Sequence, residues 1–213
     1  MSESRNKIFV IGRNKTGTTS MLVALKSLGF KMGSQAVAEL LLEDWARRDF
    51  RRIVEYCRSA DAFQDVPFSL DYTYVVLDQA FPNSKFILTI RRDSSEWYDS
   101  LLRFHTRMIG KNRTPTADDL RQFRYRKPEF LWQAAQFIYG ADENTLYDRE
   151  IYTSHYESHV RHVREYFRYR PDDLLVLNVS DPGAMKSLCE FLGIEPGDRE
   201  MPHLNASAAS SAE

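Results

Sequence analysis

Three short runs of largely apolar residues stand out along the chain, at residues 8–11, 86–90 and 174–177, and a weaker run covers residues 62–64. None of them alternates polar with apolar positions. Uninterrupted apolar runs are typical of parallel strands that are covered on both faces. Because helical patterns separate the runs, the sequence predicts an α/β fold, with a central parallel sheet flanked by helices.

Helical periodicity fills most of the intervals between these runs. Residues 18–28 carry one apolar face and are followed by Gly29, which is suited to end a helix. A second helical stretch is predicted over residues 38–58. A third follows Pro67 and stops before the turn at residues 81–84, and a fourth begins near Ser94.

The C-terminal half continues this pattern. Residues 110–170 contain no convincing strand, so helices and loops packed over the sheet are expected there. The last helix is predicted to have Asp181 as its N-cap, Pro182 in its first position and Gly193 after its end. The length suits one domain over residues 1–205, followed by a small polar tail at 206–213 that is predicted to be disordered.

Composition narrows the class of protein. The formal net charge of the 213 residues is −1, which argues against a nucleic-acid partner and places any anion site in a local feature. No apolar stretch is long enough to span a membrane and no secretory segment precedes the first strand, so a cytoplasmic protein is expected. The two cysteines, Cys57 and Cys189, are predicted to be buried, reduced thiols.

The most informative segment is residues 12–20, which follow a buried strand and open a helix. Glycines allow a sharp turn in which successive backbone N–H groups point at one anion, and the positive end of the helix dipole adds to the attraction. Thr18, Thr19 and Ser20 supply hydroxyl donors. This arrangement predicts a loop that binds a phosphate-like group.

The loop departs from the nucleotide-kinase pattern. Gly12 and Gly17 have the Walker A spacing, but Thr18 stands where that pattern has its lysine, and Lys15 lies inside the loop instead. The strand at 86–90 ends in two arginines rather than a metal-binding aspartate. A nucleoside-triphosphate enzyme needs a metal to neutralise its phosphates, so the pattern favours a group handled by cationic side chains, with no metal.

Residues 14–19, Asn-Lys-Thr-Gly-Thr-Thr, resemble the K-x-G-T-T loop of sulfotransferases that use 3′-phosphoadenosine-5′-phosphosulfate (PAPS). The resemblance implies a fold like that of P-loop NTPases and PAPS as co-substrate. It also implies that Lys15 stabilises the charge that builds on the bridging oxygen as the S–O bond breaks. The loop residues expected to bind the donor are Arg13, Asn14, Lys15, Thr16, Gly17, Thr18, Thr19 and Ser20.

The same family has a strand, an arginine at its end and a serine eight residues later, which bind the donor's 3′-phosphate. Arg92 and Ser100 have that spacing. Arg91 fits as well if distance from the start of the strand decides the register. An arginine fork suits a phosphate dianion, and the alternative for this motif is a solvated arginine pair.

Asp65 is the candidate general base. It precedes Val66-Pro67, and a bacterial-type branch of the family has D-x-P at this place, where the cytosolic branch has a histidine. An ordinary aspartate is a weak base, so burial is expected to raise its pKa. The alternatives are that Asp65 caps the next helix or pairs with an arginine.

Two further clusters have plainer interpretations. His155 and His159 have metal-ligand spacing, but without a third ligand they are interpreted as part of an amphipathic surface. The second cluster could gather an anion or form a solvated face. It consists of Arg121, Arg124, Arg126 and Lys127.

Together these features predict a sulfotransferase that moves a sulfuryl group from PAPS to a hydroxyl or amine of a small-molecule or glycan acceptor. The acceptor and the oligomeric state stay open. The alternatives are a metal-dependent nucleotide kinase or NTPase with a degenerate P-loop, and a non-catalytic nucleotide-binding module.

Overall fold

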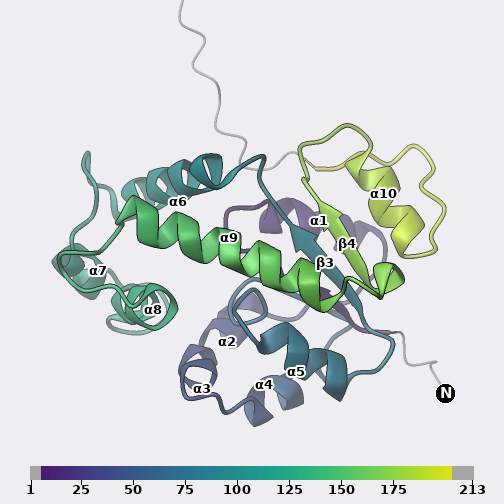
Figure 1. Ribbon diagram of the computed structural model, residues 1–213, viewed down its shortest axis with the longest axis horizontal. Helices are drawn as coiled ribbons and strands as arrows, with labels where there is room; N and C mark the ends of the chain where they lie inside the picture. The colour runs from purple at the N-terminus through teal and green to yellow at the C-terminus, as the bar shows by residue number, and fades with distance from the viewer. Residues whose placement is uncertain (1–5, 203–213) are drawn as a thin grey trace, which may run out of the picture.

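The computed structural model describes residues 6–202, and within them four parallel strands form one sheet in the order β2-β1-β3-β4. The strands are β1 (Ile8–Val10), β2 (Ala62–Gln64), β3 (Lys85–Thr89) and β4 (Leu174–Leu177). The four predicted runs are therefore all strands, and the predicted α/β fold with a central parallel sheet flanked by helices is confirmed (Figure 1).

Each strand sends side chains to two buried faces, which explains why the runs show no polar alternation. On one face Phe9 packs among Phe63 and Phe86, with ring centroids 5.8 and 5.5 Å away, beneath α3, α4, α5 and α9. The opposite face is covered by α1 and α10. These helices are α1 (Thr18–Ser27), α3 (Leu42–Ala46), α4 (Arg51–Tyr56), α5 (Thr73–Ala80), α9 (Arg149–Tyr166) and α10 (Ala184–Phe191).

A third buried cluster lies beyond the sheet and is mostly aromatic. It joins one end of α9 to α6 (Ser94–Ile109), α7 (Ala117–Gln122) and α8 (Phe130–Tyr139), and Figure 1 shows α7 and α8 at the far end of the molecule from α10. Its large members are Trp97, Tyr98, Trp132, Tyr147, Tyr152 and Tyr156. The expected helices and loops between residues 110 and 170 are confirmed.

The single helix predicted over residues 38–58 is wrong, because three short helices occupy this region. They are α2 (Gln35–Glu39), α3 and α4. Arg48 has φ 58°, a left-handed conformation that ends α3, and its guanidinium lies 4.6 Å from the Trp45 ring. Periodicity does not reveal this break, since neither glycine nor proline marks it.

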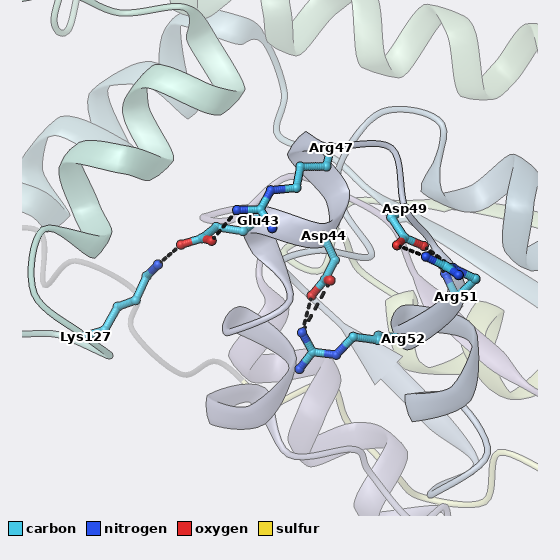
Figure 2. A network of polar contacts seen from close by, with 7 residues as sticks. All are labelled: Glu43, Asp44, Arg47, Asp49, Arg51, Arg52 and Lys127. Atoms are coloured by element: carbon cyan, nitrogen blue, oxygen red, sulfur yellow. Dashed lines mark hydrogen bonds and ion pairs between the residues drawn. The ribbon is translucent and has the colours of Figure 1, made fainter.

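Acidic and basic side chains pair around these short helices (Figure 2). Asp44 binds Arg52 at 3.1 Å, Asp49 binds Arg51 at 2.6 Å, and Glu43 contacts Lys127 from the segment between α7 and α8. The first two pairs lie within the region of these short helices, and the Glu43–Lys127 pair connects α3 to the segment between α7 and α8.

The predicted start of the last helix is also wrong. Gly183, with φ 79°, is the N-cap of α10, and Asp181 and Pro182 lie in a turn closed by the Ala184 N–H on the Asp181 carbonyl at 3.2 Å. The left-handed glycine prevents the helix from running back to Pro182. Gly193 follows the end of the helix as predicted.

Both cysteines are buried and free, as predicted. Across residues 6–202, none of the helices is both long and apolar enough to cross a lipid bilayer. The tail at 206–213, for which disorder was predicted, lies outside the described residues.

Candidate functional site

The predicted phosphate-binding loop, residues 12–17, lies at the carboxyl end of β1, where the chain passes first to β2 on one side and later to β3 on the other. Open parallel sheets bind ligands at such a switch point. Lys15 has φ 68° and Gly17 has φ 100°, so the loop turns twice before α1 begins. Gly17 is the N-cap of α1, so the loop leads directly into the N-terminus of this helix, where the helix dipole favours an anion.

The loop packs tightly against the end of β3. A Cβ on Gly12 would lie 2.1 Å from Thr89 Oγ1, so only glycine fits there. The buried Thr16 hydroxyl contacts Thr89 Oγ1 at 2.6 Å and donates to the Arg13 carbonyl at 2.5 Å. The Thr16 hydroxyl therefore makes two contacts within the protein that shape the loop, and the predicted contact of Thr16 with PAPS stays a prediction.

Lys15 lies beside α6, with its Nζ 3.7 Å from the centre of the Phe104 ring. Burial lowers the pKa of Lys15, and the nearby positive charges of Arg91 and Arg107 lower it further, whereas Asp65 raises it. Burial and the neighbouring cations thus work against the charge of Lys15, whereas the Phe104 ring and a bound anion would both favour it. The environment suits a lysine that stabilises a leaving oxygen.

Asp65 shares this environment and is held by the loop and its own neighbour. Its Oδ2 accepts a hydrogen bond from Thr18 Oγ1 at 3.3 Å, and its Oδ1 accepts one from the Val66 N–H at 2.9 Å. Burial, and secondarily the charge of Glu39, raise the pKa of Asp65 to about 6. The predicted rise is confirmed, and no arginine among residues 6–202 forms an ion pair with Asp65.

Arg13 is buried beneath the loop in an unexpected network. Its guanidinium binds Asp71 Oδ1 at 3.0 Å, and the same oxygen lies 3.0 Å from His159 Nδ1. His159 Nε2 faces the Ile11 carbonyl at 2.8 Å. The interpretation of His159 as a surface residue is therefore wrong: it is buried, and it connects α9 to the end of β1.

The two adjacent arginines have different surroundings. Arg91, with 22% of its side chain exposed, donates from Nε to the Lys15 carbonyl at 2.8 Å and from Nη1 to Glu96 at 3.2 Å. Arg92 is 79% exposed and contacts Asp93 at 3.3 Å. Ser100 is partly exposed on α6. The structure thus joins Arg91 to the loop and leaves Arg92 accessible beside the start of α6.

A cavity of about 320 Å³ opens between the loop and the helices α6, α7 and α8. Lys15 and Asp65 both line it, together with Arg13, Asn14, Thr18 and Thr19. Gly17, Ser20, Arg92 and Ser100 do not line it. The cavity therefore meets the loop at Lys15, away from the predicted 3′-phosphate ligands.

The sequence interpretation missed the residues on the helical side of this cavity. The clearest are Phe104 and His105 on α6, and Tyr147, whose hydroxyl lies 2.7 Å from His105 Nδ1. Burial and the charge of Lys15 lower the pKa of His105 to about 4, so its imidazole is neutral at pH 7. The signal was present as helical spacing, since Leu101, Phe104, His105 and Met108 share one face of α6.

The basic segment near α7 pairs with acidic residues. Arg121 binds Asp118 and Glu143, each at 2.7 Å, and Arg126 contacts Glu39. Lys127 contacts Glu43 in the network of Figure 2. These cations are engaged in ion pairs, which favours the interpretation as a solvated face over an anion trap.

A family model described as a sulfotransferase domain matches residues 7–210. The chain belongs to the sulfotransferase family. The resemblance predicted from the loop is confirmed at this level, and membership supports sulfuryl transfer as the general activity. Comparison with curated proteins gives no significant match. Among residues 6–202, no three His, Cys, Asp or Glu side chains gather in a way that could hold a metal ion.

Proposed function

We propose that this sulfotransferase moves a sulfuryl group from PAPS to a hydroxyl group of a small acceptor held in the cavity between the loop and α6. One observation carries the proposal. Lys15 and Asp65 line the same cavity at the carboxyl edge of the sheet, and each shifts the pKa of the other. A cation suited to the leaving group thus adjoins a carboxylate suited to the acceptor.

The donor would lie across the strand ends. Its phosphosulfate would meet the N-terminus of α1 and the loop around Lys15, where backbone amides and the helix dipole favour an anion. Its 3′-phosphate would lie near Arg92 and Ser100, past the end of β3. Arg91 holds the loop backbone through the Lys15 carbonyl and therefore links these two regions.

The reaction needs one proton transfer and one in-line substitution. Asp65 accepts the proton of the acceptor hydroxyl, whose oxygen forms a new bond to sulfur. The bond between sulfur and the bridging oxygen breaks, and 3′-phosphoadenosine-5′-phosphate leaves with that electron pair. Lys15 stabilises the negative charge on the departing oxygen. A carboxylate with a pKa of about 6 is ionised at neutral pH and still a useful base.

Calorimetry tests the donor assignment directly. We expect 3′-phosphoadenosine-5′-phosphate to bind at least about tenfold more tightly than ATP with Mg²⁺, because a bound 3′-phosphate adds charge-assisted hydrogen bonds. Tighter binding of ATP would favour the kinase alternative. A sulfate-transfer assay in excess chelator completes the test, since full activity is expected and strict dependence on Mg²⁺ would contradict the proposal.

A further inference from the structure

We propose that Arg13 forms a second polar subsite of the cavity and that the acceptor is a hydroxy acid, whose carboxylate binds Arg13 while its hydroxyl faces Asp65. The inference rests on the proposed function and adds a charged group to the acceptor. The loop motif predicted Arg13 to bind the donor, whereas the surroundings of its side chain assign it to the acceptor.

Arg13 is a buried cation with unused hydrogen-bond donors. Its side chain is 2% exposed, and the residue lines the cavity beneath the loop. Nη2 binds Asp71 Oδ1 at 3.0 Å, but Nε and Nη1 are buried and have no hydrogen-bond partner. Buried polar groups are normally paired, and a guanidinium can only donate. The free donors of Arg13 therefore indicate the place of a ligand oxygen.

The ion pair with Asp71 occupies only one part of the Arg13 guanidinium. Asp71 Oδ1 is shared, because it also lies 3.0 Å from His159 Nδ1, and the Asp71 side chain is 36% exposed. The paired side of Arg13 thus reaches toward water, and its free donors lie in the interior. Hydrogen bonds between a guanidinium and a carboxylate are roughly twice as strong as neutral ones, so a carboxylate is the oxygen group that suits these donors best.

Other side chains on the sheet side of the cavity are also free to bind a polar group. Asn14, Gln64 and Ser69 line the cavity, and within residues 6–202 their side chains form no hydrogen bond. Each of them has an N–H or O–H group that can donate to an oxyanion. The sheet side of the cavity therefore offers several donors beside Arg13, as a carboxylate site requires.

The charges in the cavity set the orientation of the acceptor. Asp65 would repel a carboxylate but accepts a hydroxyl proton, so the carboxylate belongs at Arg13 and the hydroxyl at Asp65. Burial raises the pKa of Tyr139 to about 12, and the charges of Arg13 and Asp65 act on it in opposite directions. Both groups therefore lie near this tyrosine, which also lines the cavity. A short hydroxy acid can reach both within a volume of about 320 Å³.

Matched acids and amides test the inference on the unaltered protein. With PAPS as donor, we compare para-hydroxybenzoate, para-hydroxyphenylacetate and para-hydroxyphenylpropionate, each with its primary amide. Acid and amide share their ring and nearly their shape, so the charge is the main difference. We expect kcat/KM of at least one acid to exceed that of its amide by at least about tenfold. A smaller preference in all three pairs would overturn the inference.

Calorimetry extends this comparison to probes that are not sulfated. If none of the six compounds is turned over, their binding is measured on the protein saturated with 3′-phosphoadenosine-5′-phosphate. We expect at least one acid to bind at least about tenfold more tightly than its amide, because only the acid forms a charge-assisted bond to Arg13. A smaller difference in every pair would again overturn the inference.

Arg13→Lys tests the residue itself. Lysine keeps a positive charge for Asp71 but lacks the additional donors of the guanidinium. We expect the ratio of kcat/KM between acid and amide to fall at least about fivefold. The matched control is Arg58→Lys, an exposed arginine paired with Glu55 outside the cavity, which should leave the ratio unchanged. An unchanged ratio in folded Arg13→Lys would overturn the inference, and if this variant does not fold, the acids and amides still decide.

Binding of 3′-phosphoadenosine-5′-phosphate separates the inference from the proposed function. If the parent protein binds it and no acid is preferred over its amide, the inference fails and the donor assignment stands. If the parent protein does not bind it, the proposed function fails and the inference fails with it. Weaker nucleotide binding by Arg13→Lys, with an unchanged ratio between acid and amide, would return Arg13 to the donor and overturn the inference.

Discussion

The two sides of the candidate site are built in opposite ways. On the sheet side, the loop from Gly12 to Gly17 depends on backbone geometry and on short polar contacts, such as Thr16 to Thr89 at 2.6 Å. On the helical side, α6 and α8 present aromatic and aliphatic side chains with few polar groups left to bond. Under the proposed function, the sheet side would hold the anionic donor by backbone position, and the helical side would hold the acceptor by the shape of its wall.

This contrast explains why the sheet side carries a recognisable sequence motif and the helical side does not. Backbone-driven binding requires particular residues at particular positions, as Gly12 illustrates. An apolar wall accepts many residues of similar volume, so it leaves a weak pattern in the sequence. We therefore expect the sharpest mutational effects on the sheet side of the cavity and graded effects on the helical side.

The largest effect is expected from Lys15→Ala, which removes the ammonium group that lines the cavity from the loop. We expect kcat to fall by about 10²–10³-fold, because the leaving oxygen loses its cation, while the fold stays intact. The matched control is Lys26→Ala, an exposed lysine of α1. Steady-state kinetics with circular dichroism measures this, and a loss below about threefold would contradict the role of Lys15.

Substitutions of Arg91 and Arg92, both on the sheet side, are expected to weaken the binding of different nucleotides. Arg92→Ala should weaken 3′-phosphoadenosine-5′-phosphate by about 10–100-fold, yet leave adenosine-5′-phosphosulfate, which lacks the 3′-phosphate, unchanged. Arg91→Ala should weaken both ligands alike, because it releases the loop at the Lys15 carbonyl. Calorimetry with the two ligands decides this, and the reverse pattern would assign the 3′-phosphate to Arg91.

The pH dependence of kcat/KM tests the role of Asp65, which lines the cavity between the two sides. Because burial raises the pKa of Asp65 to about 6, kcat/KM should fall about tenfold per unit as the pH drops below 6. Asp65→Asn should lose most of the activity, and what remains should not fall at this pH. A parent profile flat down to pH 5 would remove Asp65 as the base.

The raised pKa of Asp65 also makes the stability of the folded protein depend on pH. A carboxyl group whose pKa is raised on folding stabilises the folded state at low pH, and this contribution is lost as the pH rises from the ordinary value of 3.8 through about 6. Asp65→Asn should therefore be more stable than the parent at pH 8, by about 1–2 kcal/mol. Urea unfolding at pH 8 measures this difference.

The smallest effect is expected on the far edge of the helical side. Lys127→Ala removes the contact to Glu43 shown in Figure 2, where both side chains are about a third exposed. Exposed ion pairs contribute little to stability, so the free energy of unfolding should fall by less than about 1 kcal/mol. Lys186→Ala, which removes a similar pair to Glu190 on α10, serves as the reference. A loss above about 2 kcal/mol would show that this edge holds the helical side in place.

The sequence predicted the sheet better than the helices around it. Strands β1, β2 and β3 are almost fully buried on both faces and β4 is mostly half-buried, so their apolar runs are distinctive. The break at Arg48 was missed because a left-handed arginine stacked on Trp45 is a tertiary effect with no local signal. His159 was misjudged for the same reason, since its partners Asp71 and Ile11 are far away in the sequence.

The residues of the candidate site likewise differ in whether a local sequence pattern pointed to them. Motifs drew attention to the loop and to Asp65, and the structure brings Lys15 and Asp65 to one cavity, while their roles stay predictions. Helical spacing offered a signal for His105, but not for its contact with Tyr147, which joins α6 to a loop before α9 and depends on how the helices pack. The assignment of Arg92 and Ser100 stays a prediction, as does the D-x-P branch.

The backbone at Gly12 packs so closely against Thr89 that the loop and the end of β3 cannot be placed independently of each other. The loop meets Thr89 through Thr16 and meets Arg91 through the Lys15 carbonyl, so both contacts connect it to the end of β3. If the donor binds as proposed, the distance between its phosphosulfate at the loop and its 3′-phosphate beyond β3 depends on how β1 pairs with β3. Redesign for a longer or shorter donor would begin with the pairing of these two strands.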